Sequence, residues 1–126
     1  MRHNPAQVSS PVGGYSHGLE VAAGQRLVFV SGQIPERLDG SVPEAFEDQC
    51  HVVWDNVAAV LASAGMSLAD VVKVTTFLTD RRQVDANGRI RRERLGELRP
   101  ALTVMVAQTL DPKWLLEIEV VAAQGS

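Results

Sequence analysis

The order of strand-like and helix-like segments in this chain predicts a two-layer α+β domain, in which two helices cover one face of a mixed β-sheet. Runs of β-branched and aromatic residues alternate with segments whose apolar residues recur every three or four positions. The order is strands, helix, strand, helix, strands, so the βα alternation of a doubly wound fold is incomplete. A chain of 126 residues, 45% of them hydrophobic and 21% charged, has the size and composition of one globular unit. We therefore expect residues 1–126 to form a single domain.

The first half of the chain contains two expected strands and one expected helix. The segment from Gly13 to Gly18 is compatible with a short edge strand, and Arg26–Gly32 has the β-branched and aromatic composition of a buried strand. Ser41 and Glu44 have the spacing of a capping box, which predicts that a helix begins there. Gly65 supplies a left-handed terminator for this helix. Its apolar stripe consists of Phe46, Cys50, Val53, Val57, Val60, Leu61 and Ala64.

The second half contains three expected strands and a second helix. Val71–Leu78 is rich in β-branched residues and predicts a strand. A second helix is expected over about residues 81–95, with a break or an irregular turn at Asn87-Gly88, because glycine costs about 1 kcal/mol relative to alanine inside a helix. Ala101–Val106 and Trp114–Ala123 are expected to be the last two strands, separated by a turn that contains aspartate and proline.

Two pairs of polar side chains are candidates for chemistry. Strand alternation places Glu117 and Glu119 on one face of the last strand. One of them could orient or activate a water molecule as a general base, or both could be exposed glutamates on the solvated side of the sheet. Tyr15 and His17 share a face if their segment is a strand, and both can donate hydrogen bonds to a ligand. The alternative is that Tyr15 packs with its hydroxyl at the surface and His17 is an edge residue.

Several other kinds of site are not expected. The lone Cys50 excludes an internal disulfide, and its neighbour His51 points about 100° away from it on a helix, so they do not form a nucleophilic pair. The three histidines and single thiol have no metal-ligand spacing, so no metal site is expected. The chain has no glycine-rich loop of the P-loop or dinucleotide-binding type, so no cofactor is expected.

Charge and hydropathy argue against nucleic acid and membrane partners. The formal net charge is −3, although seven of the 12 Lys and Arg residues lie between Arg81 and Arg99. Acidic residues are interleaved with these arginines and no aromatic residue lies among them, which favours a solvated helix face over an RNA-binding surface. No apolar run approaches the roughly 20 residues that span a bilayer, and no signal-peptide stretch follows Met1-Arg2-His3-Asn4-Pro5. A cytoplasmic protein is therefore expected.

Six short motifs occur in an order that resembles one known family. They are Gly14-Tyr15-Ser16-His17, Val30-Ser31-Gly32-Gln33-Ile34-Pro35, Asp55-Asn56-Val57, Ala64-Gly65, Arg99-Pro100-Ala101 and the run from Glu117 to Ala122. Together they resemble the RidA/YjgF family of enamine/imine deaminases, whose members have also carried the labels endoribonuclease L-PSP and translation inhibitor. The resemblance implies a chorismate-mutase-like fold, a homotrimer, and a small-molecule ligand held in clefts between subunits.

The resemblance also implies a reaction and roles for individual residues. In active family members the substrate is a small enamine or imine, such as 2-aminoacrylate, which is hydrolysed to a keto acid and ammonia without a cofactor. By this resemblance, Tyr15 lines the cleft, the Ser31-Gly32 backbone offers an amide, and Glu117 positions the attacking water. Imine hydrolysis needs a group that stabilises the charge developing in the transition state and a group that accepts and donates the proton.

The chain departs from the family pattern after Pro100. Active members have an arginine two residues after this proline and often a cysteine two further on, where this chain has Leu102 and Val104. The arginine pairs with the substrate carboxylate, so its loss implies an atypical substrate preference. Arg99 is a candidate to supply a guanidinium instead, and Asn87 competes with Asp85 for the position of the family's ligand-side asparagine. The alternative is a non-hydrolytic trimeric ligand-binding or regulatory protein on the same fold.

Overall fold

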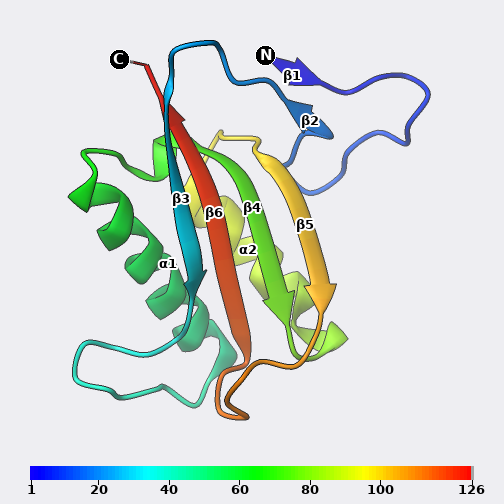
Figure 1. Ribbon diagram of the computed structural model, residues 1–126. Helices are drawn as coiled ribbons and strands as arrows, with labels where there is room; N and C mark the ends of the chain where they lie inside the picture. The colour runs from blue at the N-terminus through cyan, green and yellow to red at the C-terminus, as the bar shows by residue number, and fades with distance from the viewer. Residues whose placement is uncertain (126) are drawn as a thin grey trace.

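The computed structural model describes residues 1–125 and consists of a four-stranded sheet with two helices packed on one face (Figure 1). The strand order is β3-β6-β4-β5; β6 runs antiparallel to both neighbours, and β4 pairs in parallel with β5. The predicted α+β class with a mixed sheet is confirmed. The elements are β3 (Arg26–Gln33), α1 (Phe46–Ser63), β4 (Val71–Leu78), α2 (Val84–Leu95), β5 (Ala101–Val106) and β6 (Leu116–Gln124), with short helices η1 (Leu68–Asp70) and η2 (Arg81–Gln83).

The hydrophobic core lies between the sheet and the helices. On the central strand β6, the helix-facing residues Leu116, Ile118 and Val120 are buried, and Trp54 and Leu61 of α1 are fully buried against them. The alternation predicted for this strand is therefore confirmed, although the strand begins at Leu116 rather than at residue 114. Burial of these apolar side chains is the main stabilising contribution, at about 25 cal/mol per Å².

The opposite face of the sheet is not covered by any element of residues 1–125. We call it the open sheet face; among its side chains are Phe29, Phe77, Met105, Glu117 and Glu119. Phe29 is 74% exposed, and Glu119 is also exposed. Phe77 lies directly opposite Glu117 in the β4–β6 ladder, so the two side chains share this face.

The N-terminal segment differs from the expected strand at residues 13–18. Only Gly18–Leu19 forms a strand, β2, which pairs with β1 (Arg2–His3), and Ser16 makes a single parallel bridge to Ala101. Gly13 and Gly14 have φ values of 99° and 84°, a left-handed backbone that glycine adopts easily and that turns the chain instead of extending it.

The first helix begins four residues later than the apparent capping box at Ser41 predicts. Its N-cap is Ala45, which makes no capping hydrogen bond with its side chain. The Ser41 hydroxyl instead donates to Oδ1 of Asp39 at 2.7 Å, closing a local turn. Such turns compete with helix capping for the same side chains.

The second helix is continuous, so the expected break at Asn87-Gly88 is wrong. α2 runs from Val84 to Leu95 without interruption, after a true capping box between Asp80 and Gln83. Ile90 is fully buried in the core, and this packing outweighs the intrinsic penalty of one glycine.

Candidate functional site

The carboxylate of Glu117 lies against the backbone of Gly32 on the open sheet face. Glu117 is on the central strand β6, and Gly32 is on the neighbouring strand β3, where the register shifts between Val30 and Gln33. A Cβ atom added to Gly32 would overlap Oε2 of Glu117 and come within 2.8 Å of its Cδ and 3.0 Å of its Cγ. The glutamate side chain therefore occupies the space that any other residue at position 32 would fill.

Ser31, whose backbone was expected to contribute an amide, precedes Gly32 in this irregular stretch and is exposed. A β-bulge leaves one residue outside the ladder and re-aims its neighbours. The Ser31-Gly32 stretch and Glu117 thus form one cluster on the open sheet face, which we call the Glu117 cluster.

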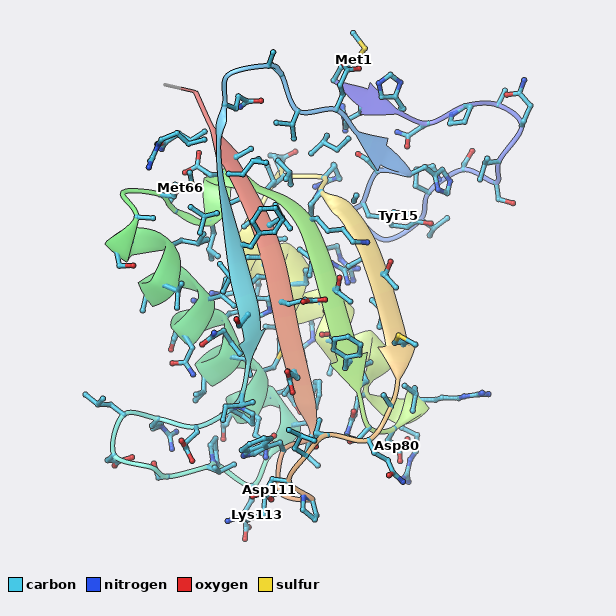
Figure 2. All side chains as sticks on the ribbon, in the orientation of Figure 1. Met1, Tyr15, Met66, Asp80, Asp111 and Lys113 are labelled. Carbon is cyan, nitrogen blue, oxygen red and sulfur yellow. The ribbon has the colours of Figure 1, made fainter. Side chains whose placement is uncertain are left out.

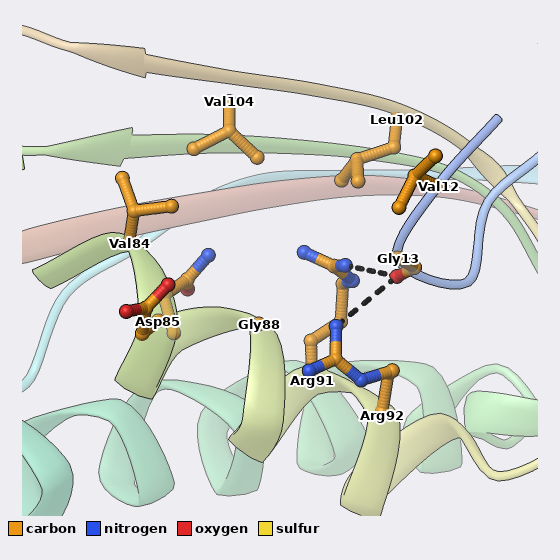
Figure 3. Close-up of a pocket in the computed structure, with 10 residues that line it drawn as sticks. Val12, Gly13, Val84, Asp85, Gly88, Arg91, Arg92, Leu102 and Val104 are labelled. Atoms are coloured by element: carbon orange, nitrogen blue, oxygen red, sulfur yellow. Dashed lines mark hydrogen bonds between the residues drawn. The ribbon is translucent and has the colours of Figure 1, made fainter.

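A second cluster lies on the other side of the sheet, in a cleft of about 510 Å³ between β5 and α2 (Figure 3). Leu102 and Val104 of β5 form one wall, and both also pack against the hydrophobic core. We call this space the α2–β5 cleft. Its other lining residues are Val12, Gly13, Val84, Asp85, Asn87, Gly88, Arg91 and Arg92.

Asn87 and Asp85 both line the α2–β5 cleft, but their environments differ. Asn87 is only 2% exposed, and its Oδ1 atom is buried without a hydrogen-bond partner among residues 1–125. Asp85 is exposed. A buried amide oxygen without a partner is unfavourable and is satisfied when a donor binds beside it.

Two guanidinium groups lie between α2 and the glycine turn of the N-terminal segment (Figure 3). Arg91 donates through Nη2 to the carbonyl oxygen of Gly13 at 2.6 Å, and Arg92 donates through Nη1 to the same oxygen at 3.3 Å. Arg91 is 5% exposed, and its burial lowers the pKa of its guanidinium, with a smaller contribution from the charge of Arg92. Within residues 1–125 neither arginine forms an ion pair.

The interpretation of the arginine cluster as a solvated helix face is wrong for Arg91. It fits Arg82, which is exposed and pairs with Asp80 at 2.7 Å. Arg91 follows Asn87 by four residues, and side chains four apart lie on the same face of a helix. Because Asn87 was already a candidate for contact with a ligand, this spacing was the signal that could have identified Arg91.

Tyr15, His17 and Arg99 lie near the beginning of β5. Figure 2 shows Tyr15 on the segment that leads into β2, and its ring packs edge-to-face on His17 with centroids 5.6 Å apart. Arg99 donates through Nη1 to the carbonyl oxygens of Gly96 and Leu98, both at 3.0 Å. Its guanidinium is therefore engaged at the end of α2, and Arg99 is not among the residues that line the α2–β5 cleft.

Cys50 and other candidate groups add nothing to either cluster. Cys50 is fully buried, and desolvation raises the pKa of its thiol to about 12, so the nucleophilic thiolate is scarce near neutral pH. Among residues 1–125 no three histidine, cysteine, aspartate or glutamate side chains are grouped closely enough to hold a metal ion. In the same range no helix has both the length and the apolarity required to cross a bilayer.

The two clusters face opposite sides of the sheet. β4 lies between β6 and β5, and the side chains of Leu102 and Val104 point to the helices whereas Glu117 points away from them. One protomer therefore does not bring Glu117 and Leu102 together in a single cleft.

Comparison with known proteins identifies the family. The family model described as endoribonuclease L-PSP matches residues 6–124. The chain belongs to the RidA/YjgF family. A RutC family protein of Pyrococcus abyssi is 35% identical over 118 residues, covering 89% of this chain and 87% of its relative. The "Putative reactive intermediate deaminase TdcF" of Escherichia coli is 37% identical over 70 residues, which cover 55% of this chain and 52% of TdcF.

The solved structures of this RidA/YjgF family support the same assignment. The crystal structure of YyfB from Yersinia pestis, described as a Rid family protein of unknown function, superposes with a TM-score of 0.86. Its sequence is 27% identical to this one, and the match covers 98% of both chains. The two-layer fold of this RidA/YjgF member is thus that of its structural relatives.

Proposed function

We propose that this RidA/YjgF protein hydrolyses small reactive enamines or imines to a carbonyl compound and ammonia. The observation that carries the proposal is the Glu117 carboxylate, which lies against the Gly32 backbone on an otherwise uncovered sheet face. The name of TdcF, which describes a reactive intermediate deaminase, supports the same reaction class.

The proposed reaction uses Glu117 as a base and then as an acid. Its carboxylate orients a water molecule and accepts a proton as the water oxygen bonds to the carbon of the C=N group. The π electrons move to nitrogen, which takes a proton, and the resulting carbinolamine expels ammonia as the C=O bond forms. An enamine first takes a proton at carbon and becomes the imine. A backbone amide of the Ser31-Gly32 stretch would steady the developing charge, and Tyr15 would line the cleft.

The complete site would be formed between protomers of a homotrimer. In this arrangement the α2–β5 cleft of one protomer faces the Glu117 cluster of its neighbour, so that a ligand lies between them. The opposite orientation of the two clusters in one chain supports this arrangement. So does the open sheet face, since it exposes more than one large apolar side chain, Phe29 and Met105 among them, as surfaces that another subunit covers do.

Leu102 would give the site an atypical substrate preference. An arginine at this position would make a charge-assisted contact with a carboxylate, worth about 1.5–3 kcal/mol, or roughly 10- to 100-fold in affinity. Leucine offers only an apolar wall, which Val104 extends. Substrates with an apolar part beside the C=N group are therefore favoured over the shortest ones.

Freshly generated imines provide the direct test of the proposed reaction. An amino-acid oxidase with a panel of amino acids produces 2-imino acids, and semicarbazide competes with hydrolysis for each imine. The protein is expected to reduce semicarbazone formation for at least one member of the panel in proportion to its concentration. If no imine is hydrolysed faster than in buffer, the protein is not a deaminase of this class.

A non-hydrolytic ligand-binding or regulatory role is the second candidate. Leu102 and Val104 favour it because they stand where active family members have an arginine and often a cysteine. In that case Leu102→Arg should create imine hydrolysis that is absent from the wild-type protein. If the wild-type protein is a deaminase, the same variant should instead improve KM for short 2-imino acids by roughly 10-fold, within the range of a charge-assisted contact. Steady-state kinetics of both proteins on the imine panel distinguishes the two outcomes.

A further inference from the structure

We propose that Arg91 of α2 is the anion-binding residue of the α2–β5 cleft and that it takes the carboxylate of the ligand from the helix side. The inference rests on the proposed function insofar as the cleft is the substrate half-site, and it names the residue that selects the substrate class. β5 has no positive charge at Leu102, and Arg91 provides one from the opposite wall of the same cleft.

The environment of Arg91 is that of a charged group without its counter-ion. Its side chain lines the cleft and is 5% exposed, and its hydrogen bond within residues 1–125 is to the carbonyl oxygen of Gly13. A guanidinium has five N–H donors and remains charged near neutral pH. A buried charge that lacks a partner is strongly unfavourable, and a bidentate carboxylate is the partner whose geometry matches it.

Neighbouring groups shape the rest of the anion site. Asn87 lies one helical turn before Arg91, and its buried Oδ1, which has no partner among residues 1–125, can accept only from an N–H or O–H of the ligand, so the carboxylate lies on the arginine side of it. The guanidinium of Arg92 fits beside Arg91 because position 88 is a glycine: a Cβ there would lie 3.1 Å from Nη1 of Arg92. Two positive charges therefore meet at the Gly13 end of the cleft.

The other lining groups set the orientation and the class of the ligand. Asp85 is the one acidic side chain among the lining residues, so the carboxylate binds at the Gly13 end, away from it. Val12, Leu102 and Val104 supply apolar surface facing the arginines. The ligand class is thus a carboxylate with an apolar chain, for which a cleft of about 510 Å³ has room.

A matched pair of stable probes tests this inference without any turnover. Binding of 4-methylpentanoate and of its neutral analogue 4-methylpentanamide is measured by calorimetry at constant ionic strength. The wild-type protein is expected to bind the carboxylate 10- to 100-fold more tightly than the amide, as for a charge-assisted contact. Arg91→Gln, which keeps a donor for Gly13, should abolish this preference, and Arg89→Gln, an exposed site outside the cleft on the same helix, should retain it.

Either of two results overturns the inference: no carboxylate preference in the wild-type protein, or a preference that survives in Arg91→Gln. If thermal denaturation shows that Arg91→Gln is not folded, Arg91→Lys is used instead. This variant should bind the carboxylate more tightly than the amide by a smaller factor than the wild-type protein, because an ammonium group makes no bidentate contact. An unchanged preference in that variant contradicts the role. This assay measures binding and not turnover. A negative result here does not contradict imine hydrolysis, and a negative result in the imine assay does not contradict the preference for the carboxylate.

Discussion

Glu117→Gln is expected to reduce the kcat of imine hydrolysis by about 100- to 10,000-fold, the range typical of losing a general acid–base group. Glutamine has nearly the same shape and can still lie against Gly32, but it cannot accept a proton from the attacking water. The folded structure should be unaffected, because the side chain faces the open side of the sheet. The measurement is the kcat of the purified variant on the best imine of the panel.

Glu119→Gln is the matched control. Glu119 lies two residues further along the same strand, on the same face, and is exposed. Its replacement removes an identical charge from the same surface and should leave kcat within about twofold, as for a surface change without a special role. Equal losses in the two variants would mean that the effect is one of surface charge and not of a positioned carboxylate.

Gly32→Ala is expected to lower kcat by about 100-fold, since a displacement of a catalytic group by about 1 Å can have an effect of that size. The added methyl group would overlap Oε2 of Glu117, so the carboxylate must move away from the backbone. The backbone at Gly32 does not have a positive φ, so alanine itself is not strained there. The kinetics are to be measured together with thermal denaturation, which should change little.

Gly18→Ala is the control for the loss of a strand glycine. Gly18 also lacks a positive φ, and the atom nearest to a Cβ added there would be Cβ of His3 at 3.4 Å, an ordinary contact.

The double variant of Gly32→Ala and Glu117→Gln adds a second check, because the effects on kcat of two changes that act through one carboxylate are not additive. If Gly32→Ala lowers kcat further in the Glu117→Gln background by the full factor, the glycine acts by some other route.

The fold class could be predicted because its signals are local and agree with one another. The β-branched composition of 71–78 indicates a strand, and the alternation at 116–120 and the apolar stripe from Phe46 onwards indicate which face of each element is buried. The start of α1 could not be located, because Ser41 bonds to Asp39 in a turn that competes with capping. The continuity of α2 depends on the tertiary packing of Ile90, which propensity does not measure.

The site could be predicted only in part. The resemblance singled out Glu117 and Gly32, and the structure places their side chain and backbone in contact. Alternation along one strand does not say which strand lies beside it, so this contact was not visible in the sequence. Arg91 was missed because the turn at Gly13 and Gly14, far away in sequence, is what covers it.

One working site is expected to combine the α2–β5 cleft of one protomer with the Glu117 cluster of another. Glu117→Gln inactivates the Glu117 cluster, and Leu102→Trp fills the α2–β5 cleft. The two inactive variants are refolded together in equal amounts, and imine hydrolysis is measured. Random assembly gives both intact halves in about one quarter of the clefts of a ring-shaped oligomer, so about a quarter of the wild-type rate should return. If the mixture shows only the average of the rates of the two variants, each site lies within a single chain and no site is shared between protomers.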